Sequence, residues 1–127
     1  MAYLFVALGG ALGSMARYAC SGAAARLLGV GFPYGTLFVN VTGSYVIGVL
    51  GTLALAGGSA LATTNARGFL IVGILGGFTT FSSFSLETLN LARAGNLAGA
   101  ATNISLSLAL CLVAVWLGYA TATAFAR

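Results

Sequence analysis

Residues 76–88 read GGFTTFSSFSLET, and this stretch interrupts the third of four long apolar segments. Two adjacent glycines followed by two threonines are poor helix formers, so we expect the helix to break near Gly76–Thr80. A break at membrane depth frees backbone carbonyls and amides, which another group or an ion must then bind. The break is therefore a candidate cation site made of backbone carbonyls.

Three phenylalanines of the same stretch, Phe78, Phe81 and Phe84, recur every three residues, so on a helix they form one stripe. Ordinary packing against lipid or against the core would also produce such a stripe. Hydroxyl groups, including that of Ser83, fill the positions between the rings. Because an aromatic ring has a positive edge, phenyl edges beside hydroxyls favour a small anion without adding a charge. The stripe thus predicts the lining of an anion path.

Composition indicates a membrane protein, since 60% of the 127 residues are hydrophobic and only 5% are charged. A helix needs about 20 mostly apolar residues to cross a bilayer. We therefore expect an all-α, multi-pass protein of the cell membrane, with residues 1–127 as one domain of four transmembrane helices. Four apolar segments fill the sequence almost completely, over residues 3–25, 33–57, 67–92 and 97–124.

Several other classes find no support in the residues. The chain has no histidine, no cysteine cluster and no pair of carboxylates, so we expect no enzyme. The five arginines are scattered, which gives no basis for binding nucleic acid. The first apolar segment could be a signal peptide, but no Lys or Arg precedes it and Arg17 interrupts it, so we expect it to remain as a span.

The arginines give no clear orientation in the membrane. If the N-terminus is cytoplasmic, Arg67 and Arg127 lie inside, whereas Arg26 and Arg93 lie outside. Because orientation follows an excess of Lys and Arg in short loops, this balance predicts either a weak bias or insertion in both orientations. Insertion in both orientations would allow an antiparallel homodimer. Arg17 adds little to either count; it either snorkels to the interface or attracts anions in an aqueous vestibule.

Polar side chains also mark the second and fourth spans. Asn40 lies several residues into the membrane, where an unpaired amide is costly, so it either bonds another helix or donates its NH₂ group to an anion. Thr36 precedes it by one turn on much the same side. In the fourth span Asn103, Ser107 and Cys111 recur every four residues and form a second, weaker polar track.

The 19 glycines suit close contact between helices, because apolar burial does not drive helix association in lipid. Small residues let two backbones approach each other instead. The glycines that we expect at such contacts are Gly9, Gly10, Gly13, Gly43, Gly48 and Gly73.

The sequence resembles the Fluc (CrcB) fluoride channel family along essentially its whole length. The matching motifs are residues 10–14 with Arg17, residues 35–37 with Asn40, and above all residues 76–88. The resemblance implies a passive fluoride-selective channel that exports cytoplasmic fluoride and so lowers its toxicity. It also implies an antiparallel, dual-topology homodimer with two pores and a structural sodium ion at its centre.

The same resemblance implies roles for individual residues. The rings of Phe81 and Phe84 would line the pore, Asn40 would coordinate the anion, and the backbone carbonyls of Gly76 and Thr79 from both subunits would bind Na⁺. This chain has Asn103 where the family often has tyrosine. With the polar residues noted above, the expected anion pore comprises Arg17, Thr36, Asn40, Phe81, Ser83, Phe84, Asn103 and Ser107.

Two rival functions are open at this point. The first is a proton-coupled exporter resembling the small multidrug resistance proteins, which depend on a carboxylate deep in a membrane helix. The only acidic residue here is Glu87, which lies late in the third span. The second rival is a membrane subunit that transports nothing itself.

Fluoride export has a chemical rationale, because HF that enters from an acidic exterior dissociates in the cytoplasm and traps the anion there.

Overall fold

The computed structural model describes residues 1–55, 61 and 63–125, and the regular structure of this part of the chain is entirely helical. Four helical segments follow one another, which confirms the expected all-α class and helix number. The predicted end of the second span at residues 56–57 and the terminal Arg127 lie outside the described residues. The first two segments are α1 (Ala2–Leu28) and α2 (Tyr34–Leu55), and the last is α6 (Leu97–Phe125).

The third segment is divided into four pieces. It begins with α3 (Thr64–Arg67), continues as a π-helix, η2 (Gly68–Leu75), and ends its first half with the short α4 (Gly76–Phe78). After two extended residues it resumes as α5 (Phe81–Arg93). The sequence pattern predicted the interruption but not the π-helix, a form that is rare and often found at functional sites.

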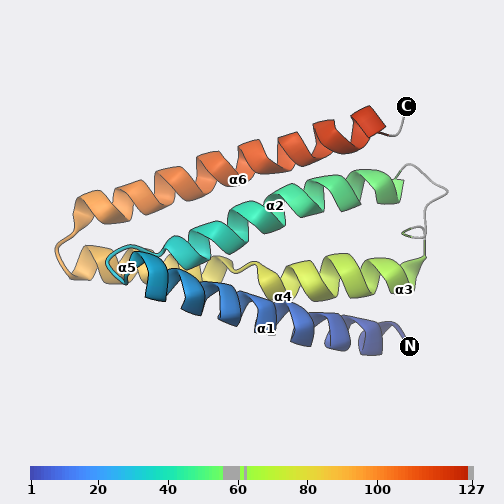
Figure 1. Ribbon diagram of the computed structural model, residues 1–127, viewed down its shortest axis with the longest axis horizontal. Helices are drawn as coiled ribbons and strands as arrows, with labels where there is room; N and C mark the ends of the chain where they lie inside the picture. Colours follow the sequence, from blue (N-terminus) through green and yellow to red (C-terminus); the bar gives the residue numbers. More distant parts are fainter. Residues whose placement is uncertain (56–60, 62, 126–127) are drawn as a thin grey trace.

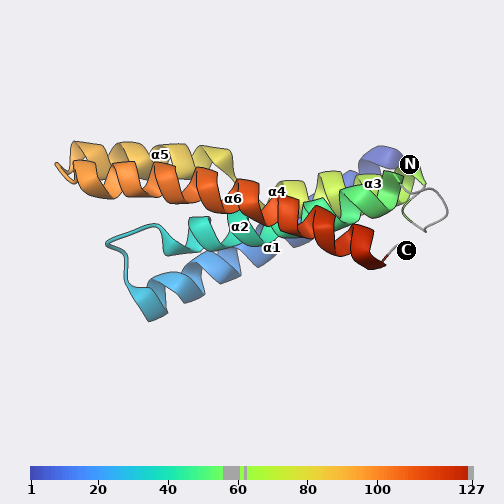
Figure 2. The same ribbon diagram turned by 90° about the horizontal axis from the view of Figure 1, so that it is seen from above.

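The segments run side by side along the long axis of the molecule (Figure 1). Helix α2 contacts α6, whereas α1 lies against η2 and α4. Both chain termini lie at one end of the bundle, and the α1–α2 and α5–α6 connections lie at the other. Towards that second end, α5 with α6 separates from α1 with α2, so that the bundle divides into two arms (Figure 2).

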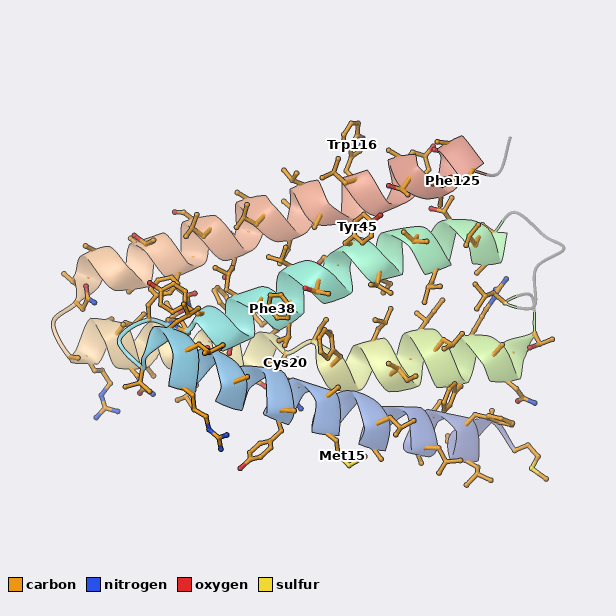
Figure 3. All side chains as sticks on the ribbon, in the orientation of Figure 1. Met15, Cys20, Phe38, Tyr45, Trp116 and Phe125 are labelled. Carbon is orange, nitrogen blue, oxygen red and sulfur yellow. The ribbon has the colours of Figure 1, made fainter. Side chains whose placement is uncertain are left out.

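Three helical segments are long and apolar enough to cross a membrane: Tyr34–Leu55, Thr64–Arg93 and Leu97–Phe125. Helix α1 is of similar length, but Arg17 and its glycines and serines make it less apolar, so the fourth span stays a prediction. The outer surface suits lipid. For example, Trp116 is 63% exposed and points away from the bundle (Figure 3).

Glycines let α1 and the first half of the third segment touch backbone to backbone. A Cβ atom added to Gly73 would lie 2.9 Å from the Cα of Gly9, and one added to Gly13 would overlap the carbonyl oxygen of Ile74. This contact confirms the packing role of these three glycines. Gly10 differs, because a Cβ atom there would meet nothing within 4 Å.

A second close contact joins α2 to α6. A Cβ atom on Gly48 would overlap the carbonyl oxygen of Val115, and one on Gly118 would overlap that of Tyr45. The Tyr45 hydroxyl also donates to Thr121 Oγ1 at 3.3 Å, and Figure 3 shows this ring between the two helices. The four-segment bundle thus consists of two pairs, each closed by glycines.

A tight turn joins α5 to α6. Gly95 takes φ 81°, a left-handed conformation that favours glycine, and the Asn96 amide donates back to the Leu91 carbonyl at 3.0 Å. The Asn96 side chain then accepts from the Gly99 amide at 2.8 Å and so caps the start of α6. The two helices are therefore antiparallel neighbours, and α5 is held beside α6.

Candidate functional site

The helix break lies at two threonines rather than at the two glycines. Gly76 and Gly77 remain in α4, whereas Thr79 (φ −85°, ψ 157°) and Thr80 (φ −155°, ψ 114°) are extended. The Leu75 carbonyl still accepts the helical bond from the Thr79 amide at 2.9 Å, and Thr79 Oγ1 adds a second bond to the same oxygen at 2.9 Å. The Thr80 hydroxyl does replace a helical bond, because its Oγ1 accepts from the Ser83 amide at 3.1 Å. The predicted break near Gly76–Thr80 is thus confirmed.

Asn40 on α2 binds the broken backbone with both ends of its amide. Its Nδ2 donates to the Thr80 carbonyl at 3.0 Å, and its Oδ1 accepts from the Thr80 amide at 2.7 Å. The side chain therefore pairs with the peptide groups of Thr80 as a neighbouring strand would. A primary amide has two N–H groups, so one N–H remains for another acceptor.

Hydroxyls gather at the start of α5. Thr80 Oγ1 accepts from the Ser83 amide and donates to Ser83 Oγ at 3.1 Å, and Ser82 Oγ lies 3.2 Å away. The N-terminus of this 13-residue helix adds a partial positive charge at the same place. The break thus presents hydroxyls and a helix terminus that favour negative charge.

A cavity of about 400 Å³ opens beside the break. Helices α2, α5 and α6 and the end of the first half of the third segment line it, and all its lining residues are neutral. The ring centroids of Phe81 and Phe84 lie 5.2 Å apart at this cavity. The two rings differ in burial, since Phe84 is 8% exposed and Phe81 is 74% exposed. The cavity brings together six of the ten residues that were expected to line the anion pore or to bind sodium, which are Asn40, Gly76, Thr79, Phe81, Phe84 and Ser107.

A second cavity, of about 510 Å³, lies between the two arms of the bundle. Thr36 and Glu87 line it, together with Asn90 and the α1–α2 connection. Thr36 Oγ1 donates to Glu87 Oε1 at 2.8 Å, while Glu87 Oε2 is buried without a hydrogen-bond partner among the described residues. Because α2 and α5 line both cavities, polar groups follow this helix pair from the break towards the end of the bundle.

Asn103 on α6 is buried against α5 and lines neither of these two cavities. It is 1% exposed, its Nδ2 donates to Thr88 Oγ1 at 2.9 Å, and its Oδ1 accepts from Ser107 Oγ at 3.5 Å. It therefore ties α6 to α5, and of the α6 track Ser107 and Cys111 reach the first cavity. Ser83, which was expected in the pore, is engaged with Thr80.

Arg17 contacts the break from the opposite side. Its Nε donates to the Gly77 carbonyl at 2.9 Å, and the side chain lines neither of these two cavities. This bond differs from both expectations for Arg17, which were snorkelling to the interface and attraction of anions in a vestibule. The signal was present in the spacing, because Gly9, Gly13 and Arg17 recur every four residues and so share the face of α1 that meets the third segment.

The two carbonyls expected to bind a cation have lost their usual helical partners. In a continuous helix, Gly76 would accept from the Thr80 amide and Thr79 from the Ser83 amide. Those amides donate instead to Asn40 Oδ1 and to Thr80 Oγ1. Carbonyl oxygens of this kind are the donors that hard cations prefer, so the donor set fits a sodium ion.

Comparison with known proteins gives one consistent family. The sequence model of a family described as "CrcB-like protein, Camphor Resistance (CrcB)" matches residues 4–119. Relatives from several organisms carry the name "Fluoride-specific ion channel FluC". That of Opitutus terrae is 56% identical over 120 residues, covering 94% of this chain and 91% of the relative. That of Rhodospirillum rubrum is 52% identical, covering 94% of this chain and 92% of the relative. That of Methylocella silvestris is 49% identical, covering 98% of this chain and 95% of the relative.

Proposed function

This chain belongs to the CrcB family, and on that premise we propose that it is a passive, fluoride-selective ion channel of the cell membrane. It is a channel rather than an enzyme, and it lets cytoplasmic fluoride leave the cell and so lowers fluoride toxicity. The relatives are named ion channels, which favours this function over a proton-coupled exporter that uses Glu87.

The observation that carries the mechanism is the neutral cavity beside the break. Fluoride is small and strongly hydrated, so a pore has to replace its water with other donors while binding it weakly enough for release. The remaining N–H of Asn40, the hydroxyl of Ser107 and the edges of Phe81 and Phe84 are such donors at this cavity. They suit an anion without adding a fixed charge.

We further propose that two copies assemble as an antiparallel homodimer. Phe81 is exposed although it belongs to the predicted pore wall, so a second copy would complete that wall. The arginines of the sequence also favour mixed orientation, because Arg26 and Arg93 end α1 and α5 at one end of the bundle, Arg67 ends α3 at the other, and Arg127, outside the described residues, makes the predicted count two against two. Helix α1 packs along the third segment and would form the fourth span.

A sodium ion at the dimer centre is part of the same proposal. The carbonyls of Gly76 and Thr79, whose helical amides bind elsewhere, would hold it together with the same carbonyls of a second copy. When bound, the ion would offset the partial negative charge of these oxygens. Replacing external and internal Na⁺ by a large organic cation should then lower the flux.

The test of the function is fluoride efflux from proteoliposomes, followed with a fluoride electrode. We expect efflux to start when valinomycin lets K⁺ leave with fluoride, because a passive channel needs only a gradient and a counter-ion. Liposomes without protein are the blank, and an active fluoride channel prepared alongside is the positive control. A silent protein beside an active control would support a membrane subunit without transport and would refute the channel.

The test of assembly is cross-linking together with labelling of the termini. Opposed copies should give cross-links between opposite ends of α1, and a tag at the C-terminus should be labelled from both sides of the membrane. Labelling of every C-terminus from one side alone would rule out the antiparallel dimer.

A further inference from the structure

Arg17 occupies an unusual place for a charged residue in a membrane helix. It lies in the second half of α1 and is half-buried, and its Nε donates to the carbonyl of Gly77, the residue before the last residue of α4. The backbones are close there, since a Cβ atom on Gly77 would lie 2.6 Å from the Gly10 carbonyl oxygen. The guanidinium group thus contacts the broken segment from α1, a helix that does not line the cavity beside the break.

The Gly77 carbonyl needs this partner because of the break. In a continuous helix it would accept from the amide of Phe81. Phe81 instead begins α5, after the extended Thr79 and Thr80, so the helix cannot supply that amide. A carbonyl without a partner at membrane depth is costly, and a charged donor forms the stronger kind of hydrogen bond.

We propose that Arg17 is a positioning residue of the channel: its Nε–H replaces the missing amide at Gly77 and thereby fixes the geometry of the break. Gly76 and Thr79, the proposed sodium ligands, flank Gly77 and Phe78, so their carbonyl directions depend on how this carbonyl is held. Arg17 acts through the backbone, because it lines neither the cavity beside the break nor the cavity between the arms. The inference rests on the proposed function.

The charge of Arg17 also suits this place. The carbonyls at the end of α4 carry the partial negative charge of a helix C-terminus, which a cation stabilises. Because the side chain is only half-buried, the Nη groups can remain near water while Nε binds inward. A donor and a charge are therefore both available, and substitutions can separate them.

Three variants make that separation. In Arg17→Gln the amide nitrogen stands at the same number of bonds from Cα as Arg Nε, so the donor is kept and the charge removed. In Arg17→Lys the charge is kept, but a methylene group replaces Nε. In Arg17→Met both are lost. Arg93→Lys, at an exposed residue in the last turn of α5, is the matched control because it keeps the charge count.

Fluoride efflux and its dependence on sodium are the readouts. We expect Arg17→Gln to conduct close to the wild type, and Arg17→Lys and Arg17→Met to lose about tenfold, the factor that one charge-assisted hydrogen bond is worth. The last two should also need more Na⁺ for half-maximal efflux, a shift that a mere loss of folded protein would not cause. Arg93→Lys should behave as the wild type.

Two outcomes of the efflux assay would overturn the proposal. If Arg17→Lys conducts as well as or better than Arg17→Gln, the charge acts and the donor does not. Equal losses in all three variants with an unchanged sodium dependence would indicate only a folding defect. Hydrogen exchange of peptides covering residues 74–85 tests the positioning role of Arg17 separately from the channel function. If the wild type is silent, faster exchange in Arg17→Met but not in Arg17→Gln still supports the positioning role, and equal exchange refutes it.

Discussion

The two halves of the third segment are held in place by different forces. Before the break, η2 and α4 lie against α1 through glycines, with backbone touching backbone at Gly9, Gly13 and Gly73. After the break, side-chain hydrogen bonds from α2 and α6 bind Thr80 and α5: Asn40 to Thr80, Thr36 to Glu87, and Asn103 to Thr88. Apart from the Arg17 bond to the Gly77 carbonyl, the first half is placed by shape and the second by polar groups.

This difference explains why we expect the anion path to follow the second half. Donors at membrane depth are tolerated only where they have partners, so the groups that fix α5 are also those that a passing ion can meet. A glycine contact, by contrast, leaves no donor for a ligand. We therefore expect variants at the glycine contact to reduce folding, whereas variants of the polar groups that bind Thr80 and α5 should reduce flux in a folded protein.

The largest effect is expected at the glycine contact. In Gly13→Val the new side chain would overlap the Ile74 carbonyl and force α1 away from η2, at a cost of about 3 kcal/mol. We expect little assembled protein in detergent and a lowered melting temperature by size exclusion and thermal unfolding. Gly10→Val is the matched control, because a Cβ atom at Gly10 meets nothing within 4 Å. Equal behaviour of the two variants would contradict the role of shape in this half.

The next effect is expected at Asn40. Asn40→Leu has a similar size but leaves the amide and the carbonyl of Thr80 without their partners, and it removes a donor from the cavity. The loss of two hydrogen bonds corresponds to a decrease of about a hundredfold in fluoride efflux. The α1–η2 contact should survive, so the variant should elute as the wild type does. A variant that aggregates while its glycine contact is intact would weaken the distinction between the halves.

A smaller effect is expected at the rings. Phe81→Ile and Phe84→Ile keep apolar bulk but remove the positive ring edge, and each should lower efflux by about tenfold. Efflux rates of reconstituted single and double variants measure this, and thermal unfolding of each checks the fold. Phe78→Ile is a control within the same stripe, since Phe78 is not among the residues that line the cavity beside the break. Wild-type flux in the double variant would remove the ring-edge argument.

The smallest effect is expected at Glu87. Glu87→Gln keeps an oxygen for the Thr36 hydroxyl and removes the charge, so a channel should conduct fluoride as before. Flux should be compared at several pH values in the wild type and the variant. Loss of a pH-coupled cation exchange in the variant would instead favour the exporter and would give Glu87 a direct role in transport.

Much of the fold was accessible from the sequence because its signals are local. Apolar length predicted the helices, and the Gly-Gly-Phe-Thr-Thr run predicted the break. The pattern did not show which residues of that run are extended. Both glycines stay helical, and Gly77 allows the approach of α1, whereas Thr79 and Thr80 are extended and Thr80 Oγ1 accepts from the Ser83 amide in place of a backbone carbonyl. Local propensity indicates a weak point in a helix, but side-chain bonding decides where it opens.

The partners of the polar side chains were less accessible, since they are far apart in sequence. Asn40 and Thr80 are 40 residues apart, and Arg17 and Gly77 are 60 apart. The depth of each residue predicted that it must have a partner, but only the helix packing selects which one. The π-helix had no sequence signal that we recognised, and the anion-binding roles of the named residues stay predictions.

The position of both chain ends at one end of the bundle has a consequence for gene fusion (Figure 1). In an antiparallel pair, the C-terminus of one copy and the N-terminus of the other face opposite compartments. A simple soluble linker therefore cannot join them. A covalent tandem that preserves the pairing would need one additional membrane-crossing helix between its halves, making nine crossings from two four-span units, and a tandem without it would force both copies into the same orientation.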